Sequence, residues 1–482
     1  MHPTPFHRKP RNPRFYREKD KYHISSIITK NLVSSVVGTD VPSSVGTLGA
    51  TSVVTSCSGT TSAHTPTWTQ KDLQHHLKIS QAAVTQNPAY VVRARIGTPA
   101  QTLLVAMDTS NDAAWIPCAG CVGCSSTTFD TARSSTFKTV SCGDQRCNQV
   151  PNPSCGGTTC GFNLSYGGST FAASLVQDTL ALASDPITSY SFGCIQRATG
   201  TSLPPQGLLG LGRGPLSLLS QTPNLYHSIF SYCLPNYKSV NFSGSLKLGT
   251  KNQPKKIKCT QLLRNPRRSS LYYVNLMAIR VGGHVVKIPP SAFAFDPNTG
   301  AGTVLDSGIM FTSLVKPAYT AVRDELRRRM RNATVSSLGG FDTCYTVPIV
   351  VPTITFMFAS MNVTLPQDNF LIRSTAGTTS CLAMAAAPEN VNSVVNIIGS
   401  FQQQNHRILI DEAKSRLCVS RHLLFAFFKR LSKDLRDKKI NKPTLENGSF
   451  GEFDASQSTT IGIKFIKGLH GSNQLTGIGI YV

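Results

Sequence analysis

The feature that most constrains this chain is an internal repeat, in which a short apolar run ends in an aspartate and a hydroxyl residue. The two copies are "LLVAMDTS", which contains Asp108, and "GTVLDSG", which contains Asp306. Each copy is followed, at a similar distance, by two apolar residues and a glycine: Gly210 in "GLLGLG" and Gly399 in "NIIGSF". A repeat of this size implies two similar lobes.

The context of these two aspartates separates them from other Asp-Ser and Asp-Thr dipeptides. Asp130, Asp178 and Asp342 also precede a hydroxyl residue, but such dipeptides are common in turns. Only Asp108 and Asp306 come directly after an apolar run that has no helix caps and reads as a core strand. A buried carboxylate is costly unless it finds a partner. If the lobes pack about a pseudo-twofold axis, each aspartate is the other's partner.

Such a pair of carboxylates has a definite chemistry. Two carboxyl groups about 3 Å apart cannot both ionise readily, so they share one proton and titrate as a unit. The ionised member takes a proton from a trapped water, and the protonated member donates to the carbonyl under attack. We expect Thr109 and Ser307 to tie the two loops together by side-chain to backbone hydrogen bonds across the axis. This chemistry needs no metal and no cofactor.

The rest of the pattern predicts a mostly β protein. The clearest helical stretch is 315–331, "VKPAYTAVRDELRRRMR", with Pro317 near its start. Short strand-like runs separated by Gly or Pro lie at 90–97, 102–107, 174–182, 189–194, 244–249, 272–283, 302–308, 354–358, 394–399 and 406–411.

Length and charge limit the possible partners. With 482 residues the chain can hold more than one core, since single cores stop growing near ~250–300 residues. We expect no membrane span, because no run of ~18 apolar residues occurs. The net charge of +24 would suit nucleic acid, an acidic cell wall or a membrane surface. The Lys and Arg residues are scattered, however, and no dedicated nucleic-acid motif occurs, so we favour a basic solvated surface and expect no nucleic-acid partner.

The cysteines indicate an oxidising, secreted setting. The chain has 14 Cys, crowded between Cys118 and Cys160, and an even count beside glycosylation sequons favours a disulfide framework. The sequons begin at Asn163, Asn241, Asn332, Asn362 and Asn447. "CAGCVGC" also has metal-ligand spacing, but no matching half follows, so we expect bridges within the 118–160 cluster and no metal. The opening residues lack the apolar segment of a signal peptide.

These residues together resemble the pepsin-like aspartic proteases, in particular the plant nepenthesin-type branch and its apoplastic, defence-associated aspartyl proteases. The resemblance runs from about Tyr90 to Leu417, through "AYVVRARIGTP", "SYGGS", "YSFGC", "LPPQGLLGLGRGPLSLLSQ", "FSYCLP", "FDTCY" and "FQQQNHRILID". It implies a bilobal β fold with a central cleft and the activity of an aspartic endopeptidase. It also implies a monomer that acts on peptide or protein substrates, binds pepstatin-like inhibitors, requires no cofactor and is secreted to the extracellular space or apoplast.

The resemblance also assigns roles to individual residues. It makes Asp108 and Asp306 the catalytic pair, supported by Thr109, Ser307 and Gly308.

Two aromatic residues complete the implied site. Tyr166, in "SYGGS", becomes the flap tyrosine that folds over the cleft, and Trp115 becomes its hydrogen-bonding neighbour behind Asp108. From the residues alone, an aromatic on a Gly-flanked hairpin tip is either a mobile lid or an ordinary core tyrosine.

The polar, Ser/Thr-rich composition of the first 85 residues and the resemblance together divide the chain. Residues 1–85 are expected to be a propeptide-like or disordered arm, 86–265 the N-terminal lobe with a Cys-rich insertion at 118–160, and 266–418 the C-terminal lobe. Residues 419–482 form an atypical tail outside the fold. For the cysteines beyond the insertion, the implied bridges are Cys344 with Cys381 and Cys194 with Cys233.

The chain departs from the family pattern at two places inside the lobes. Where the family has a hydroxyl residue after Asp-Ser-Gly, this chain has Ile309. Either the lost donor weakens the ionised form of Asp306 and displaces the pH optimum upward, or a backbone amide or Ser307 already holds Asp306 and Ile309 only packs. The family's last strand and closing cysteine are also expected to be missing after "HRILIDEAKSRL".

Two further function classes compete with the protease. The same fold serves as plant inhibitors of glycoside hydrolases, in which the catalytic motifs are degraded, so a catalytically weakened homologue that acts as an inhibitor or binding protein is the alternative. DNA binding is the third, because the basic charge would permit phosphate contacts.

Overall fold

The structure is a computed structural model that describes residues 76–81, 90–125, 127–236, 244–255, 257–374, 376–389, 393–420, 462–466 and 477–481. The described residues up to Ser420 belong to one unit. A hairpin of β28 (Gly462–Ile466) and β29 (Gly477–Tyr481) belongs to a second unit, and its strands pair in antiparallel register. The remaining residues, including most of the arm and tail expected from the sequence, lie outside the described part.

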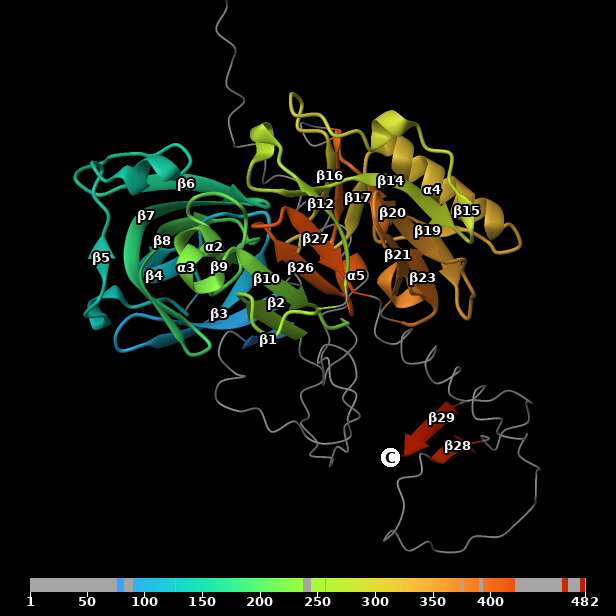
Figure 1. Ribbon diagram of the computed structural model, residues 1–482, viewed down its shortest axis with the longest axis horizontal. Coiled ribbons are helices and arrows are strands. Elements are labelled where there is room, and N and C mark those ends of the chain that lie inside the picture. Colours follow the sequence, from blue (N-terminus) through green and yellow to red (C-terminus); the bar gives the residue numbers. More distant parts are fainter. Residues whose placement is uncertain are drawn as a thin grey trace, which may run out of the picture. The chain divides into compact units, whose positions relative to one another are not determined.

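The N-terminal lobe is a set of mainly antiparallel strands, drawn blue to green in Figure 1. In β2 the residues alternate strictly over its second half between buried and exposed, which is the pattern of a strand with one face on a core. The lobe contains β2 (Tyr90–Ile96), β3 (Gln101–Asp108), β4 (Trp115–Val122), β5 (Lys138–Thr139), β6 (Gly161–Tyr166), β7 (Ser169–Leu182), β8 (Asp185–Thr199) and β9 (Leu208–Gly210), with α2 (Leu218–Gln221) and α3 (Pro223–Tyr226).

The C-terminal lobe combines a share of the large sheet with two four-stranded sheets, ordered β15-β14-β20-β21 and β18-β19-β23-β22. In Figure 1 it is drawn yellow to orange. Its strands are β13 (Tyr272–Val274), β14 (Leu276–Val281), β15 (His284–Val285), β16 (Gly302–Leu305), β17 (Thr312–Leu314), β18 (Ser336–Leu338), β19 (Phe341–Thr346), β20 (Ile354–Phe358), β21 (Asn362–Leu365), β22 (Leu371–Arg373), β23 (Thr379–Leu382), β24 (Met384–Ala386) and β25 (Val395–Ile398). The prediction of a mostly β, two-lobed fold is therefore confirmed.

Strands from both halves of the chain meet in one sheet between the lobes. β10 (Ile229–Cys233) pairs with β11 (Gly244–Leu248) on one side and with β26 (Arg407–Asp411) on the other. β26 then pairs with β27 (Arg416–Val419), and β27 pairs with β12 (Lys258–Leu263). A change in this sheet therefore acts on both lobes at once.

Two predictions about the ends of the fold are corrected by this sheet. The final strand, expected to be missing, is present as β27, and its Cys418 forms a disulfide with Cys259, directly opposite on β12. The sequence signal was Cys418 itself, which directly follows "HRILIDEAKSRL". At the other end, β1 (His76–Gln81) pairs with β11 and β2, inside the range predicted to be an arm.

The cysteines of the described residues are paired, with one connection that differs from expectation. Within the insertion Cys121 bonds Cys124, Cys142 bonds Cys155 and Cys147 bonds Cys160, while Cys344 bonds Cys381 as predicted. Cys118 bonds Cys194 instead of staying within its cluster, so the proposed Cys194–Cys233 bridge is wrong. The physical reason is that β4 and β8 run in parallel with Ile116 beside Cys194, which brings Cys118 within reach.

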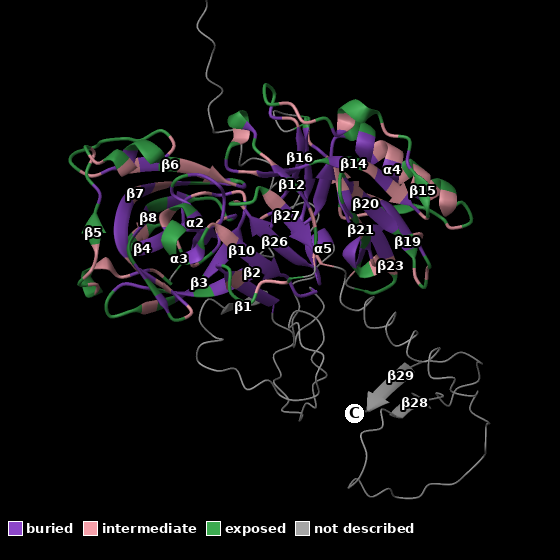
Figure 2. Cartoon of the chain, in the orientation of Figure 1, coloured by how far each residue is buried: buried purple, intermediate pink, exposed green. Residues whose placement is uncertain are grey.

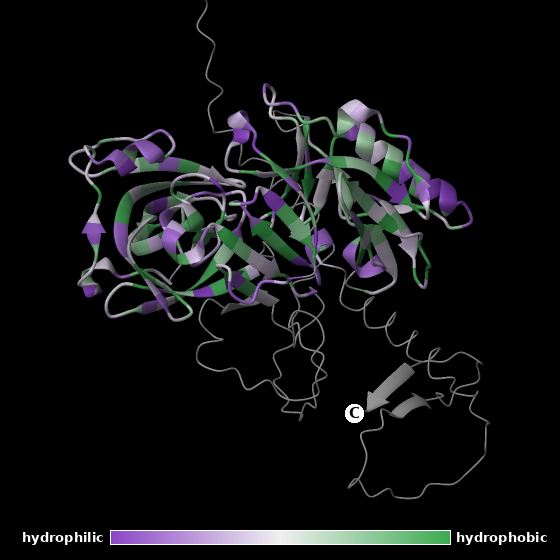
Figure 3. Cartoon of the chain, viewed as in Figure 1, coloured by the Kyte–Doolittle hydropathy of each residue, from purple (hydrophilic) through white to green (hydrophobic). Residues whose placement is uncertain are grey.

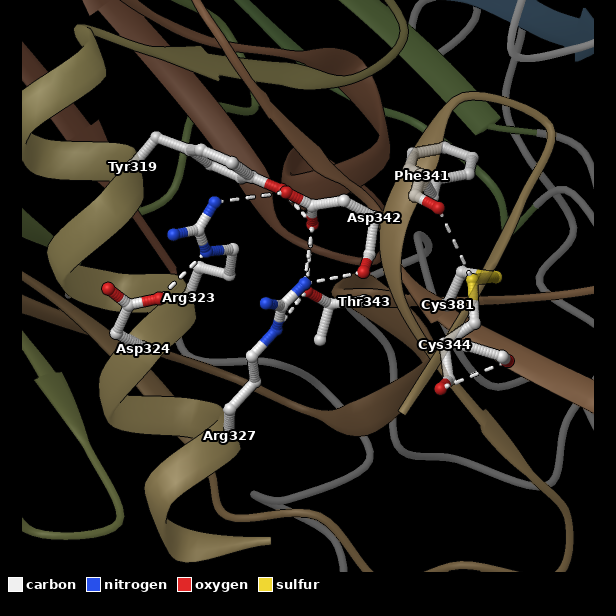
Figure 4. A network of polar contacts seen from close by, with 10 residues as sticks. Tyr319, Arg323, Asp324, Arg327, Phe341, Asp342, Thr343, Cys344 and Cys381 are labelled. Carbon is white, nitrogen blue, oxygen red and sulfur yellow. Dashed lines mark hydrogen bonds and ion pairs between the residues drawn. A yellow bond between two sulfur atoms is a disulfide. The ribbon is translucent and has the colours of Figure 1, made fainter. Parts of the chain in front are cut away.

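The predicted helix is α4 (Lys316–Arg329), with a proline in its first turn. It buries Ala318, Tyr319, Val322 and Leu326 on one face, as the helical period requires. Along the edge of this face, Arg323 and Arg327 reach Asp342 of β19, and the Tyr319 hydroxyl donates to the same carboxylate at 2.5 Å (Figure 4). Some of the basic side chains thus form ion pairs within the chain. Ion pairs that are exposed to solvent contribute little to stability.

Burial and hydropathy agree on where the core lies. The strands at the centre of the large sheet are mostly buried in Figure 2, and they are largely hydrophobic in Figure 3. The connecting loops are mostly exposed, and Asn163, Asn332 and Asn362 are exposed as sequon acceptors must be. Asn241 and Asn447 lie outside the described residues. Within the described ranges, no helix is long and apolar enough to cross a membrane.

Truncation tests the role of β27. A chain that ends after Ser415 loses the strand between β26 and β12, the fully buried Leu417 and the Cys259–Cys418 bridge. We expect its free energy of unfolding to fall by at least about 3 kcal/mol, from the lost apolar burial and the lost cross-link. The matched control ends after Ser420 and should melt close to the full chain, as predicted for a dispensable tail. Equal denaturation curves for the two truncations would contradict this account.

Candidate active site

The two aspartates end strands that occupy equivalent places in the two lobes. β3 ends at Asp108 and runs parallel to β9, with Asp108 opposite Gly210. β16 stops one residue before Asp306 and runs parallel to β25, which is followed by Gly399. The repeat seen in the sequence is thus one structural unit, a strand with an aspartate at its end and a neighbouring apolar strand that leads to a glycine.

The glycines of the repeat are required by close approach. A Cβ at Gly210 would lie 2.1 Å from the carbonyl oxygen of Asp112, and one at Gly399 would lie 2.6 Å from that of Met310. Each glycine therefore lets the loop that follows the aspartate lie against the neighbouring strand.

Thr109 and Ser307 join the two aspartate loops by reciprocal hydrogen bonds. The Ser307 N–H donates to Thr109 Oγ1 at 2.9 Å, and the Thr109 N–H donates to Ser307 Oγ at 3.2 Å. The Ser307 hydroxyl in turn donates to the Met107 carbonyl oxygen at 3.4 Å. Both residues are buried, so these backbone groups depend on each other for partners. The structure thus places Thr109 and Ser307 where the sequence placed them.

Gly308 lies directly against the other aspartate. A Cβ on Gly308 would come within 2.3 Å of Asp108 Oδ2, so no side chain fits there. This contact brings the loop of Asp306 to the carboxyl group of Asp108, and the two carboxyl groups interact electrostatically.

Asp108 is surrounded by hydrogen-bond donors. The N–H and the hydroxyl of Ser110 each donate to Asp108 Oδ1 at 2.7 Å, and Asn111 Nδ2 donates to Oδ2 at 2.8 Å. The Tyr166 hydroxyl also hydrogen-bonds to Asp108. Sequence reasoning missed Ser110 and Asn111. The available signal was their position directly after Asp-Thr, where the C-terminal copy has Gly308 and Ile309.

Asp306 lies in a less polar environment. It is buried, and burial raises its pKa to about 8, with the charge of Asp108 acting in the same direction. Hydrogen bonds with the Gly308 N–H, the Ser110 hydroxyl and the Ile309 N–H lower the pKa, but by less. Asp306 therefore keeps its proton in a pH range in which an exposed carboxyl group has lost it.

Ile309 is a packing residue. Its side chain is 9% exposed and packs with Tyr273, Val304 and Ile397, while its backbone N–H bonds to Asp306. Of the two alternatives left open by the sequence, the structure matches the second, in which backbone amides hold Asp306. Burial raises the pKa of Asp306 in either case.

Tyr166 lies at the tip of the hairpin of β6 and β7, where Tyr166 pairs with Ser169. Its hydroxyl points to Asp108, and its ring meets Trp115 edge-on, with ring centroids 5.3 Å apart. The predicted hydrogen bond between the two is not formed, since the buried Trp115 Nε1 has no partner among the described residues. The phenol instead reaches Asp108, and burial together with the two carboxyl groups raises the pKa of Tyr166, so it remains a donor.

A glutamine-rich segment supports Asp306 from behind. Gln403, the last residue of α5 (Ser400–Gln403), donates to the backbone carbonyl oxygens of Asp306 at 3.0 Å and of Ile398 at 2.8 Å. The Tyr232 hydroxyl donates to Gln403 Oε1 at 2.5 Å. The segment "FQQQNHRILID" carried the family resemblance, but its role in holding this strand was not predicted.

The site offers two carboxyl groups and a phenol to a bound molecule. Across the described residues, no group of three or more His, Cys, Asp or Glu side chains is arranged to hold a metal. The cysteines that had metal-like spacing form disulfides.

Comparison with known families matches nearly the whole described unit. A family model described as "Xylanase inhibitor N-terminal" matches residues 90–250, and one described as "Xylanase inhibitor C-terminal" matches residues 271–421.

Individual relatives are named as proteases. The chain is 53% identical over 341 residues to Aspartyl protease AED3 of Arabidopsis thaliana, with 69% of this chain and 76% of that protein covered. It is 47% identical over 354 residues to Aspartyl protease 25 of Oryza sativa subsp. japonica, with 68% and 81% covered. It is 33% identical over 346 residues to aspartic proteinase nepenthesin-1 of Nepenthes gracilis, with 68% and 76% covered.

Solved structures share the fold at lower identity. The structure described as "Crystal structure of edgp" superposes with a TM-score of 0.61 at 20% identity, over 73% of this chain and 95% of that one. Conglutin gamma, a basic 7S globulin from lupine seeds, gives a TM-score of 0.60 at 20% identity, over 73% and 96%.

The raised pKa of Asp306 predicts a particular pH dependence of stability. An unfolded carboxyl group titrates near 4, so between about pH 4 and pH 8 the folded state binds more protons than the unfolded state. The stability that the Asp306 carboxyl group contributes is therefore fully present below about pH 4 and is lost as the pH rises through about 8. In Asp306→Asn the group cannot titrate. We expect the Tm of the wild type to fall relative to that of Asp306→Asn as the pH rises from 4 to 8.

Asp324→Asn is the matched control, because it removes an exposed carboxylate on α4 whose side chain is 55% exposed. Its Tm should follow that of the wild type at every pH. Parallel Tm curves for the wild type and Asp306→Asn would rule out a retained proton on Asp306.

Proposed function

This chain belongs to the plant pepsin-like aspartic proteases, and we propose that it is an aspartic endopeptidase that cleaves peptide bonds with Asp108 and Asp306. The observation that carries the proposal is the contact of the two aspartate loops. Thr109 and Ser307 bond across the pair, and Gly308 lies against the Asp108 carboxyl group. A merely structural aspartate at a strand end would not require a second such loop opposite it.

The environments of the two carboxyl groups suggest their roles. Asp108 accepts hydrogen bonds from several donors, whereas burial raises the pKa of Asp306 and favours its protonated form. In this assignment Asp108 is the general base and Asp306 the general acid, as in other carboxyl pairs whose environments push the pKa values apart. The pair titrates as a unit, so pH–rate profiles report macroscopic values.

The reaction then proceeds through a tetrahedral intermediate. Asp108 takes a proton from a water as the water oxygen bonds to the peptide carbonyl carbon, and Asp306 gives its proton to the carbonyl oxygen. Asp108 is now protonated and Asp306 charged. In the second step the carbon–nitrogen bond breaks, Asp108 donates its proton to the leaving amine, and Asp306 recovers a proton from a hydroxyl group of the intermediate. The two carboxyl groups return to their starting states.

The flap must move for a substrate to enter. In this conformation the Tyr166 hydroxyl bonds to Asp108 and so occupies a polar position that a bound water or substrate needs. We infer that the β6–β7 hairpin opens to admit a peptide and closes again above it, as lid loops do. Trp115 supports the ring of Tyr166 edge-on in the closed position.

The setting follows from the same proposal. Peptide or protein substrates and pepstatin-like inhibitors are the expected partners of a monomeric enzyme. The disulfides of the described residues, from Cys118–Cys194 to Cys344–Cys381, suit an oxidising compartment, and we infer secretion to the extracellular space or apoplast.

A binding protein remains the alternative function, for a specific reason. The matching family models are described as xylanase inhibitor domains, and a 7S globulin shares the fold. The complete pair of aspartates with its donors favours the protease.

A cleavage assay tests the proposal. The wild type should cleave a protein substrate at acid pH, and pepstatin should block it. Asp108→Asn and Asp306→Asn should each lower kcat by about 10³-fold or more, which is about 4 kcal/mol of transition-state stabilisation. Asp324→Asn, the exposed control, should retain wild-type activity. Cleavage that survives both dyad substitutions would overturn the proposal, and absent cleavage together with tight binding to a xylanase would favour the alternative.

A further inference from the structure

The third residue of each aspartate loop breaks the symmetry of the site. In both loops the backbone N–H of this residue donates to its own aspartate, from Ser110 to Asp108 Oδ1 at 2.7 Å and from Gly308 to Asp306 Oδ1 at 2.8 Å. The loops therefore share a backbone geometry but differ in the side chain at this position. Gly308 cannot carry a side chain, because a Cβ would collide with Asp108 Oδ2 at 2.3 Å. Ser110, at the related position, carries one.

The Ser110 hydroxyl reaches both carboxyl groups. It donates to Asp108 Oδ1 at 2.7 Å and also hydrogen-bonds to Asp306. Ser110 belongs to the N-terminal loop, so this hydroxyl crosses to the aspartate of the other lobe. The Thr109 and Ser307 side chains cross in a similar way, each to a backbone N–H of the opposite loop.

The fourth residue of each loop shows why this contact matters. Asn111 donates through Nδ2 to Asp108 Oδ2 at 2.8 Å. Ile309, at the related position, has no side-chain donor and packs against Tyr273 and Val395. Among the described side chains near Asp306, Ser110 supplies a donor that the C-terminal loop lacks.

We propose that Ser110 is a positioning residue of the pair, whose hydroxyl bridges the two carboxyl groups and replaces the donor that Ile309 cannot provide. This inference rests on the proposed protease function. It assigns to one hydroxyl the task of stabilising whichever carboxyl group is charged.

A hydroxyl suits this task because it has one proton to donate and lone pairs to accept. With the proton on Asp306, the Asp306 O–H donates to Ser110 Oγ, and the Ser110 O–H donates to the Asp108 carboxylate. In the tetrahedral intermediate Asp108 holds the proton and Asp306 is charged. Ser110 then accepts from Asp108 and donates to Asp306. Its O–H turns as the proton changes sides, so each charged state keeps a donor.

Among the described residues, the titratable groups near the pair do not take over this task. The groups that face Asp306 are Asp108, Tyr166 and Tyr232, by their electrostatic interactions with it. Burial raises the pKa of both tyrosines, so they remain neutral. Tyr166 bonds to Asp108, and Tyr232 donates to Gln403.

Ser110→Ala removes the hydroxyl and keeps the backbone donor. Loss of a hydrogen bond to a charged group predicts a fall in kcat of about 10- to 100-fold. The acid limb of the pH profile of kcat/KM should move to higher pH, because the first carboxylate to form has lost a donor. The alkaline limb should move little. Ser110 donates one hydrogen bond to a carboxylate both in the singly ionised pair and in the doubly ionised pair, so its loss affects the two states alike. A purely structural role would lower kcat without moving the acid limb.

Rescue gives the second measurement. Ile309→Thr in the Ser110→Ala background restores a hydroxyl near Asp306 and should raise kcat/KM about fivefold or more, while its effect on the wild type is smaller. Such non-additivity is the mark of two groups that share one task. Ser313→Ala is the matched control, since Ser313 is buried in the same lobe and its hydroxyl has no partner among the described residues; its pH profile should match that of the wild type.

The outcomes separate this inference from the function on which it rests. Absence of cleavage by the wild type would refute the protease proposal. In that case carboxyl ¹³C NMR titration of wild type and Ser110→Ala still tests Ser110, because the lower apparent pKa of the pair should rise in the variant. Wild-type cleavage with a superimposable Ser110→Ala profile would overturn the inference alone. If Ser110→Ala does not fold, Ser110→Gly, which copies Gly308, removes the same hydroxyl and serves in its place.

Discussion

The reciprocal hydrogen bonds between Thr109 and Ser307 are the interaction on which the rest of the site depends. Each side-chain oxygen accepts the backbone N–H of the other loop, in a buried environment where no water replaces a lost partner. These two hydrogen bonds fix the position of each loop relative to the other. In this position Gly308 lies against Asp108, and Ser110 lies near Asp306. The sheet that contains β10, β26 and β27 also joins the two halves of the chain.

How much the sequence could predict depended on the range of the interactions. Asp108 and Asp306 were found because a repeat shows itself in the order of residues, and α4 because its period is local. The Cys118–Cys194 bridge was missed because it depends on which strand lies beside β4. β27 was missed because its pairing with β12 joins residues far apart in the sequence. Ser110 and Asn111 were missed because a donor is recognised only once its acceptor's position is known.

The unequal surroundings of the two aspartates connect the fold to its possible functions. Proteins of this fold include a 7S globulin as well as relatives named as proteases, so the fold alone does not decide the activity. The decision rests on the donors around the pair. Asp108 has several of them, and Asp306 has backbone amides and one hydroxyl from the other lobe. In the proposed function, this asymmetry separates an acid from a base within two loops of similar backbone geometry.

A crystal structure of the protein at acid pH, at a resolution that shows the proton positions of the pair, tests the central claim most directly. We expect the Asp108 and Asp306 carboxyl groups about 3 Å apart, Ser110 Oγ within about 3.2 Å of both, and the shared proton on Asp306. Carboxyl groups more than about 6 Å apart could not share a proton, and this result would contradict the account.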